Sequence, residues 1–336
     1  MQRKVSLTGI KPTGIPHIGN YFGAIRPALE LAKEYEARYF IADYHALNSI
    51  KDPVHLKEMV YEVAAAWLAA GLDPEKVLFY RQSDVPETFD LTTILMAFTP
   101  KGLMNRAHAY KASVQENEAA GKDPDDGINM GLYTYPVLMA ADILLFDTNV
   151  VPVGKDQKQH VEMTADIAQS VNHTYGKELL VVPEAMISES AQTVVGMDGR
   201  KMSKSYNNTI SLFLPQKKLR KTVMKIVTNS QGIEEPKNPD TCSIFALYKL
   251  FATPEQQEKL AARYRAGGMG WGEAKQELFE VMDACLKPMR EKYFSIMENK
   301  DEIDRILKKG SEKARQIASR TVARVRKAIG VNTFYM

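Results

Sequence analysis

Cysteine is scarce in this sequence of 336 residues, which contains only Cys242 and Cys285, far apart and without C-x-x-C spacing. That pattern argues against a disulfide framework and a zinc site, and it fits a reducing compartment such as the cytoplasm. No apolar run is long enough to span a membrane, and no signal peptide is expected at Met1. The net charge is only +3, so any basic surface must be local.

The sequence does have the composition of an ordinary globular protein, with 45% hydrophobic and 25% charged residues. Its length allows two domains and a sizeable core. Strand and helix patterns alternate in the first part, with strands expected at 5–10, 38–47, 77–82 and 149–154, and helices at 21–32, 54–70, 88–111 and 155–171. This alternation predicts βαβ units, a parallel sheet and an α/β fold.

Beyond about residue 206 the periodicity is helical throughout. Helices are expected at 214–227, 241–252, 254–266, 272–299 and 301–329. We therefore expect an all-helical C-terminal domain behind the sheet domain. Segment 116–129, rich in Gly, Asp, Asn and Ala, is expected to be an exposed loop.

The first predicted strand runs through a loop, 11–20, into a helix. Free N–H groups and the dipole at a helix start attract phosphate. Gly19 leaves room for a ligand to approach the backbone, and His17 can donate a hydrogen bond to a phosphate oxygen. An ordinary strand–helix turn capped by Asn20 explains the same pattern. Pro27, inside the helical pattern, predicts a kink or break.

A second polar segment carries Lys201 and Lys204 among small hydroxyl residues. It follows residues 193–199, which are expected to form a strand end and a turn. Lysine ammonium groups act as point charges on phosphate oxygens, so a flexible loop of this kind suits a nucleoside triphosphate. A solvated surface loop is the ordinary explanation of an isolated pair of lysines.

Asp142 is the lone acid in a nearly apolar stretch, 133–146. An unpaired buried carboxylate is costly, so Asp142 requires a dedicated partner, either a protein group or a ligand N–H. Asp43 and His45 lie in the last part of the second predicted strand, at the end of the sheet where open α/β folds bind ligands.

Basic residues gather on two of the C-terminal helices. The first group is Lys217, Lys218, Arg220, Lys221 and Lys225, and the second is Lys308, Lys309, Lys313, Arg315, Arg320, Arg324, Arg326 and Lys327. Most basic runs of this kind are solvated helix faces, and the remaining ones bind phosphate backbones.

Two of these segments resemble paired signatures of one enzyme class. Residues 17–20, His-Ile-Gly-Asn, resemble the HIGH signature of class I aminoacyl-tRNA synthetases, and residues 201–205, Lys-Met-Ser-Lys-Ser, match their KMSKS signature in full. The order of the two also fits that class. The chain is similar over nearly its whole length to bacterial-type tryptophanyl-tRNA synthetases, in the segments 9–14, 17–24, 43–46, 135–145 and 151–160. Segments 139–142 and 153–157 resemble the tryptophanyl and not the related tyrosyl enzymes.

The resemblance implies a role for each matching residue. The catalytic residues would be His17, Lys201, Ser203 and Lys204. ATP would be bound by Lys11, Pro12, Thr13, His17, Gly19, Asn20, Gly154, Lys155, Asp156, Val194, Lys201, Met202, Ser203, Lys204 and Ser205. Asp142 would accept the indole N–H of tryptophan, in a pocket lined by Leu7, Gly9, His45, Tyr135, Met139, Ile143, Val151, Val153 and Gln157.

The resemblance also implies an architecture and a reaction. A Rossmann-like catalytic domain, 1–206, with a helical insertion at about 88–130, would precede a helical anticodon-binding domain, 207–336. The enzyme would activate L-tryptophan with ATP and transfer it to tRNA(Trp), releasing pyrophosphate and AMP. ATP would bring Mg2+, and no protein-bound metal is expected. A cytoplasmic homodimer is implied, with the region after Thr88 near the interface and no membrane or DNA partner.

Two departures and three alternatives accompany this interpretation. Lys155 stands where the family often has an acid, so its backbone is expected to matter more than its side chain. Asn20 replaces the last histidine of HIGH, as is usual in this family. A tyrosyl-tRNA synthetase, a non-catalytic paralogue and a nucleotidyltransferase that adenylylates a small acid without tRNA stay open. The intact signatures argue against the second, and the basic helical domain argues against the third.

Overall fold

The computed structural model describes residues 3–187 and 194–331. Its sheet has five strands in the order β3-β2-β1-β4-β5, and every pairing is parallel. The strands are β1 Val5–Ile10, β2 Glu36–Ile41, β3 Leu78–Arg81, β4 Val150–Val153 and β5 Glu184–Ile187. The predicted α/β fold with a parallel sheet is confirmed. Strand β5 was not predicted, since it is short and none of its residues is fully buried.

The helices of this part are α1 Ile18–Asn20, α2 Arg26–Leu31, α3 Asp43–Ala46, α4 Pro53–Ala70, α5 Glu87–Met96, α6 Lys101–Met104, α7 His108–Ala119, α8 Met130–Leu144 and α9 Lys158–Tyr175. Both faces of the sheet are covered, because alternate strand residues belong to different cores. Tyr39 and Ile41 pack in one core with α2 and α4, whereas Phe40 packs in the other with α5, α8 and α9. The sheet is therefore a buried middle layer, as a parallel sheet requires.

The second strand is shorter than predicted. Residues 38–47 were expected to be strand, yet β2 ends at Ile41 and Asp43–Ala46 form α3. The reason is the register, in which Ile41 lies opposite Ile10, the last residue of β1. Without a partner strand beyond that point, residues 43–46 turn into a helix, and this brings His45 over the end of the sheet.

Pro27 disturbs its helix, as predicted. It stands in the first turn of α2, directly after a π-helical stretch, Tyr21–Ile25. Proline has no N–H to donate to the preceding turn, so the regular α-helical ladder cannot continue through it. Helices α1 and α2 are consequently two short pieces joined by this wider turn.

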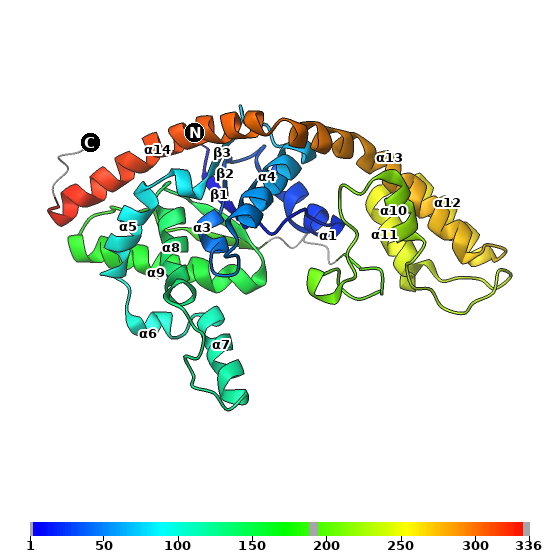
Figure 1. Ribbon diagram of the computed structural model, residues 1–336, viewed down its shortest axis with the longest axis horizontal. Helices are drawn as coiled ribbons and strands as arrows, with labels where there is room; N and C mark the ends of the chain where they lie inside the picture. Colours follow the sequence, from blue (N-terminus) through cyan, green and yellow to red (C-terminus); the bar gives the residue numbers. More distant parts are fainter. Residues whose placement is uncertain (1–2, 188–193, 332–336) are drawn as a thin grey trace.

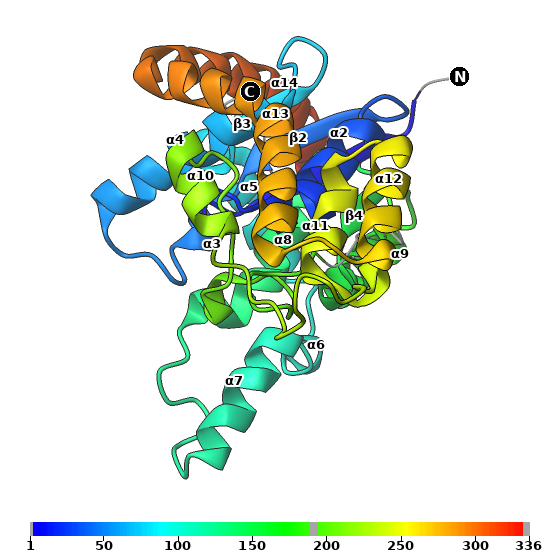
Figure 2. The same cartoon turned by 90° about the vertical axis from the view of Figure 1, so that its right-hand side faces the viewer.

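The C-terminal helices are α10 Gln216–Val223, α11 Ser243–Phe251, α12 Pro254–Ala266, α13 Trp271–Glu298 and α14 Lys300–Ile329. Helices α10, α11 and α12 gather around α13, away from the sheet (Figures 1 and 2). The helical character predicted after residue 206 is confirmed, and the domain boundary itself stays a prediction.

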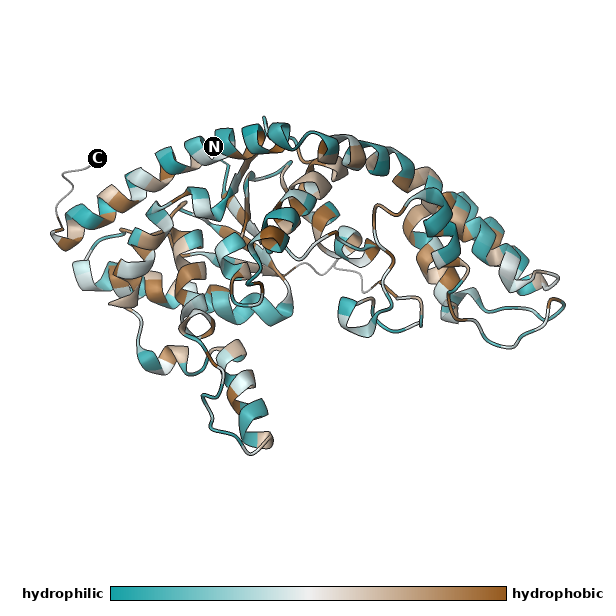
Figure 3. Cartoon of the chain, in the orientation of Figure 1, coloured by the Kyte–Doolittle hydropathy of each residue, from teal (hydrophilic) through white to brown (hydrophobic). Residues whose placement is uncertain are grey.

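Helix α14 extends away from α10, α11 and α12 and packs on the sheet domain. It runs back over the sheet domain (Figure 1), where Ala314, Ala318, Val322 and Val325 enter the core formed with α5 and α8. Hydrophobic and hydrophilic residues alternate along this helix in Figure 3. Single-helix periodicity shows that α14 has an apolar face, but it cannot show which partner covers that face.

The packing of α14 on the sheet is close. A Cβ added at Gly310 would lie 1.7 Å from the carbonyl oxygen of Phe79 in β3, so glycine lets the helix axis approach the strand. Ion pairs then connect the helix to the sheet domain, namely Lys309–Glu75, Arg315–Glu87, Arg324–Asp147 and Arg326–Asp90. Half of the second basic group is therefore paired with acids of this same chain.

Helix α7 lies apart from the rest of the molecule and projects from it in both views (Figures 1 and 2). It has no buried residue of its own. The following segment to Asn129 is largely exposed, as predicted, although α7 itself continues to Ala119. Within residues 3–187 and 194–331, no helix combines the length and the apolarity needed to cross a membrane.

Candidate active site

The two signature segments lie together at the carboxyl end of β1. The chain just after the second segment pairs with the first one. Ile18 N–H donates to the carbonyl of Ile210 at 2.9 Å, and Leu212 N–H donates to that of Pro16 at 3.0 Å. The ring of His17 lies 2.9 Å from a Cβ built on Gly19, and the Cβ of Met202 lies 3.5 Å from it. A side chain at position 19 would thus push the two segments apart.

A capping box fixes the tautomer of His17, that is, which ring nitrogen carries the proton. The N–H of Asn20 donates to His17 Nδ1 at 3.2 Å, while the N–H of His17 donates to Asn20 Oδ1 at 3.0 Å. Burial, and next the charge of Lys204, lower the pKa of His17 to about 4. The ring is therefore neutral at pH 7, and because Nδ1 accepts, its proton is on Nε2. Asn20 thereby has a structural role in place of the missing histidine.

The side chain of Asn208 binds the base of the loop 201–205, which carries Lys201 and Lys204. This buried side chain accepts from Ser203 N–H at 2.8 Å and donates to the carbonyl of Lys201 at 3.0 Å and to Asp198 Oδ1 at 2.7 Å. Sequence analysis assigned Asn208 no role. The backbone of Val194 also pairs with Met202 at 2.8 Å. The loop is thus anchored at its base, while Lys201, Lys204 and Ser205 are exposed.

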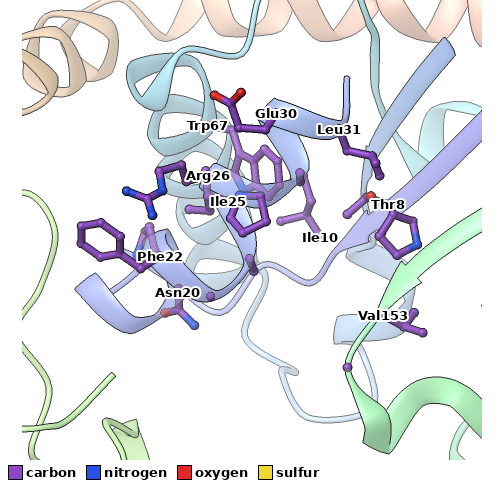
Figure 4. A pocket seen from close by; sticks show the side chains of 18 of the residues that line it. Thr8, Ile10, Asn20, Phe22, Ile25, Arg26, Glu30, Leu31, Trp67 and Val153 are labelled. Carbon is purple, nitrogen blue, oxygen red and sulfur yellow. The ribbon is translucent and has the colours of Figure 1, made fainter. Parts of the chain in front are cut away.

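A cavity of about 900 Å³ opens between β1 and β4. In this sheet order β1 lies between β2 and β4, so the connections diverge there, and such a point is where open α/β sheets bind ligands. Asn20, Phe22 and Arg26 face the cavity from the first helical segment, and Val153 faces it from β4 (Figure 4). Of the residues predicted to bind ATP or tryptophan, its lining includes Gly9, Lys11, Thr13, Asn20, Val153 and Gly154.

Other predicted ATP residues lie beside this cavity without lining it. Pro12 is buried, and Lys155 and Asp156 are exposed after β4. A Cβ on Gly154 would lie 2.6 Å from Asp156 Oδ1, so the Asp156 carboxylate folds back over that glycine. Thr193, at the start of the expected strand end, lies outside the described residues.

Asp142 has protein partners. It is 2% exposed, and Gln82 Nε2 donates to both of its carboxylate oxygens at 2.9 Å. His45 Nε2 donates to Oδ2, also at 2.9 Å. Burial raises the pKa of Asp142, and the hydrogen bonds from His45 and Gln82 act against that rise. The expected dedicated partner is therefore a pair of side chains from the ends of β2 and β3.

Gln82 was absent from the predicted site. The available signal was its position as the last residue of the third predicted strand, which is the ligand-binding end of such a sheet. Single-sequence reasoning could not show that β3 ends beside α8, which carries Asp142. Tertiary packing of α8 against the sheet made this contact.

Aromatic rings lie around His45, a hydrogen-bond partner of Asp142. The ring centroid of Tyr135 lies 5.3 Å from that of His45 and 4.8 Å from that of His160, both edge to face. The Tyr135 hydroxyl donates to Gln157 Oε1 at 2.9 Å. Tyr135, Met139 and Ile143 recur at intervals of four along α8 and share one face of it. His160, on α9, is a buried neighbour that was not among the predicted site residues.

The remaining predicted pocket residues form the wall behind this cluster. Leu7, Ile143 and Val151 are buried members of one hydrophobic core, and Met139 and Val153 pack against it. The structure thus collects most of the predicted tryptophan residues in one place, between β1, β4 and α8. A doubly wound sheet whose two signature segments meet at its switch point is the arrangement of a class I aminoacyl-tRNA synthetase.

Comparison with known proteins agrees with that class. Residues 2–287 match the family described as tRNA synthetases class I (W and Y). The tryptophan–tRNA ligase of Bordetella parapertussis is 54% identical over 97% of this chain and 72% of its own length, and that of Pseudomonas aeruginosa is 51% identical over 97% and 74%. The tryptophanyl-tRNA synthetase of Campylobacter jejuni, solved with ADP and tryptophan, has a TM-score of 0.90 and 46% identity, covering 97% of this chain and all of its own.

The chain belongs to this class I family, and within it to the bacterial tryptophan–tRNA ligases. The family expected from the two signatures is thereby confirmed. A tyrosyl enzyme from Archaeoglobus fulgidus shares only the fold, with 17% identity and a TM-score of 0.58.

Proposed function

We propose that this chain attaches tryptophan to tRNA(Trp) in two steps. The carboxylate of L-tryptophan attacks the α-phosphorus of Mg-ATP, the bond from that phosphorus to the bridging oxygen breaks, and pyrophosphate leaves. A terminal ribose hydroxyl of the tRNA then takes the aminoacyl group, and AMP leaves. The observation that carries the proposal is Asp142, a buried acceptor at the carboxyl edge of the sheet where the signature segments also meet.

ATP fits the cavity between β1 and β4. Lys11, Thr13, Asn20 and Gly154 line it, and they offer backbone and polar groups for the phosphates, the base and the ribose. His17 contributes a neutral imidazole with its proton on Nε2, which can donate to a phosphate oxygen. The relative from Campylobacter jejuni, solved with ADP and tryptophan, supports an adenine nucleotide as a ligand.

Tryptophan is placed next to this cavity, among the side chains around Asp142, with its indole N–H directed at Asp142. An apolar wall with one aimed acceptor is the arrangement that selects a ligand by a single polar group. Leu7, Ile143 and Val151 would contact the indole ring, and Tyr135 and Gln157 lie where the amino-acid group would reach toward ATP. Both assignments are part of the proposal.

The chemistry needs no side-chain nucleophile. The attacking and leaving groups belong to the substrates, so the protein contributes position and charge. Lys201, Lys204 and Ser203 would act on the pyrophosphate side of ATP, where negative charge develops as the bond breaks. Mg2+ would enter with ATP and share this task.

Transfer RNA is proposed to bind the helical part, and the structure favours one of the two basic groups. Lys217, Lys218, Arg220, Lys221 and Lys225 are exposed on and just after α10. None of these five makes an ion pair within the described part of the chain, whereas four cations of α14 do. A free cationic face suits a phosphate backbone, so we propose α10 as the contact.

A cytoplasmic homodimer completes the proposal. Helix α7 buries none of its own residues, which leaves the region after Thr88 available to a second copy. The free cysteines Cys242 and Cys285 fit a reducing compartment. Light scattering of the purified chain would determine whether it is a dimer.

ATP–pyrophosphate exchange tests the central claim. The purified chain is assayed with Mg-ATP and tryptophan, tyrosine or no amino acid. Exchange with tryptophan alone is the expected result, and charging of tRNA(Trp) would follow as the next assay. Exchange driven by tyrosine would retain the fold and overturn the role of Asp142. No exchange by a folded protein would indicate the non-catalytic paralogue.

A further inference from the structure

We propose that Gln82 is a positioning residue for amino-acid selection, because it holds Asp142 so that one carboxylate oxygen is aimed at the indole N–H. The inference rests on the proposed function and on Asp142 as the acceptor. Gln82 would not touch tryptophan itself. It would act through Asp142, and its effect would therefore appear in selectivity for the N–H group.

The position of Gln82 is rigid. It follows β3 at the start of a 3-10 turn, Gln82–Asp84, and it is completely buried. The neighbouring Ser83 is bound to the end of β2, since Ser83 N–H donates to Asp43 Oδ1 at 3.1 Å. The Ser83 hydroxyl donates to the other oxygen of the same carboxylate. These contacts lock the ends of β2 and β3 together beneath α8.

The orientation of the Gln82 amide is also determined. The backbone N–H of Tyr44 donates to Gln82 Oε1 at 3.2 Å. An N–H can only meet the oxygen of the amide, so the NH2 group must face the other way, toward Asp142. In a flipped amide, the NH2 group of Gln82 would face the N–H of Tyr44, and its Oε1 would face the carboxylate of Asp142. The contact from Tyr44 therefore presents Asp142 with a donor.

Counting acceptor positions shows what remains for a ligand. An ionised carboxylate has about four lone-pair positions, two on each oxygen. Asp142 Oδ2 accepts from Gln82 and from His45, while Oδ1 accepts from Gln82 alone. One position on Oδ1 is left over within the described structure. An indole N–H can take it, and a ring without a donor cannot.

The carboxylate has no lysine or arginine partner in the described chain. Its hydrogen bonds from Gln82 and His45 oppose the burial that favours the protonated acid. A protonated Asp142 would carry a hydrogen on one oxygen and could no longer accept from every side. Both donors consequently favour the ionised form, which accepts hydrogen bonds, but of the two only Gln82 contacts Oδ1.

The test compares tryptophan with its benzothiophene analogue, in which sulfur replaces the indole N–H. Pyrophosphate exchange is measured for the parent, Gln82→Met, Gln82→Glu and Ser83→Ala. In both Gln82 variants we expect kcat/KM for tryptophan to fall by roughly ten- to a hundredfold, mainly through KM, since an aimed acceptor is lost. The value for the analogue should change by less than about threefold, because its ring makes no such bond.

Ser83→Ala is the matched control. It removes a half-buried hydrogen bond from the same turn but leaves Asp142 untouched. We expect a lower melting temperature and unchanged selectivity. If the Gln82 variants lose activity equally toward both substrates, Gln82 has only a structural role and the inference is wrong.

Because a fully buried position can reject a new side chain, the parent chain provides a second test. A crystal structure with tryptophan bound should show Gln82 Nε2 still donating to Asp142 and the indole nitrogen at Asp142 Oδ1. A complex in which Gln82 leaves Asp142, or contacts the indole directly, would overturn the inference even if no Gln82 variant folds.

The outcomes separate the claims from one another. No exchange by the parent with tryptophan would remove the proposed function. Equal use of tryptophan and the analogue by the parent would remove Asp142 as the acceptor. Discrimination that persists in the folded Gln82 variants would remove the role of Gln82 alone.

Discussion

The ammonium group of Lys204 donates a hydrogen bond to the backbone carbonyl of Thr13, a residue 191 positions earlier. Thr13 lines the cavity between β1 and β4, so the contact places a positive charge at the edge of that cavity. Burial lowers the pKa of Lys204, and the carboxylate of Glu62 acts against this effect. The second signature segment is thus connected directly to the loop that follows β1.

Lys204→Ala should separate catalysis from binding. We expect the rate constant of adenylate formation to fall about a hundredfold or more, because a charge that stabilises the transition state is lost. The dissociation constant for tryptophan should change by less than about twofold, since Lys204 lies at the cavity proposed for ATP. Stopped-flow fluorescence measures both quantities, and Lys158→Ala, a surface lysine paired with Glu162, is the control. Equal losses in rate and affinity would contradict the assignment.

Asp142→Ala should damage the choice of amino acid. A site built around one polar contact can reject a ligand lacking the partner by roughly four to five powers of ten, so most of the preference for tryptophan over phenylalanine should disappear. The free energy of unfolding should also fall by about 1–3 kcal/mol, because Gln82 and His45 lose their acceptor. Exchange kinetics and urea denaturation provide the measurements. A variant that keeps the preference of the parent would disprove the role of Asp142.

His17 should make stability depend on pH. Its pKa is about 4 in the folded chain against an ordinary value of 6.5, so between these values the unfolded chain binds a proton that the folded chain does not. Stability from this group is complete above pH 6.5 and is lost as the pH falls toward 4. As the pH falls from 6.5 to 4, the free energy of unfolding should therefore decrease less steeply in His17→Gln than in the parent. Urea denaturation at a series of pH values measures this slope, and His55→Gln, at an exposed histidine, is the control. If His17→Gln and the parent have the same slope, the assignment to His17 is wrong.

Gly310 should tolerate no side chain. We expect Gly310→Ala to lower the free energy of unfolding by about 1–3 kcal/mol or more, because its Cβ would overlap the carbonyl oxygen of Phe79. Gly272→Ala, in helix α13 with no atom near the new Cβ, should be neutral or stabilising by up to about 1 kcal/mol. Thermal denaturation of both variants makes the comparison. Equal effects would show that α14 is not packed closely against β3.

The cations of α10 should control the binding of tRNA. For the double variant Arg220→Glu and Lys221→Glu, we expect weaker binding and a salt dependence shallower by about one unit for each lost phosphate contact. Lys309→Ala should leave that slope unchanged, because Lys309 already pairs with Glu75. Filter binding of tRNA(Trp) over a range of salt concentrations measures the slopes. If tRNA binding by the parent does not depend on the salt concentration, the proposed contact between α10 and the phosphate backbone is wrong.

Several features followed from the sequence by itself. Alternating strand and helix patterns predicted the parallel sheet, and the paired segments at 17–20 and 201–205 predicted the class. Asp142 could be recognised as unusual because a lone acid in an apolar segment needs a partner whatever the fold. These conclusions depend on local spacing and on the chemistry of single residues, both of which the sequence displays directly.

Tertiary structure decided the rest, because contacts between distant segments leave no mark on either segment alone. The sequence contained Gln82 and Asp142, but only the packing of α8 against the end of β3 made them partners. Both basic groups resembled surfaces for nucleic acid. The docking of α14 on the sheet paired half of one group with acids from the first part of the chain, and it left the cations of α10 free. Charge patterns indicate where a helix is polar, and the fold determines what that polar face meets.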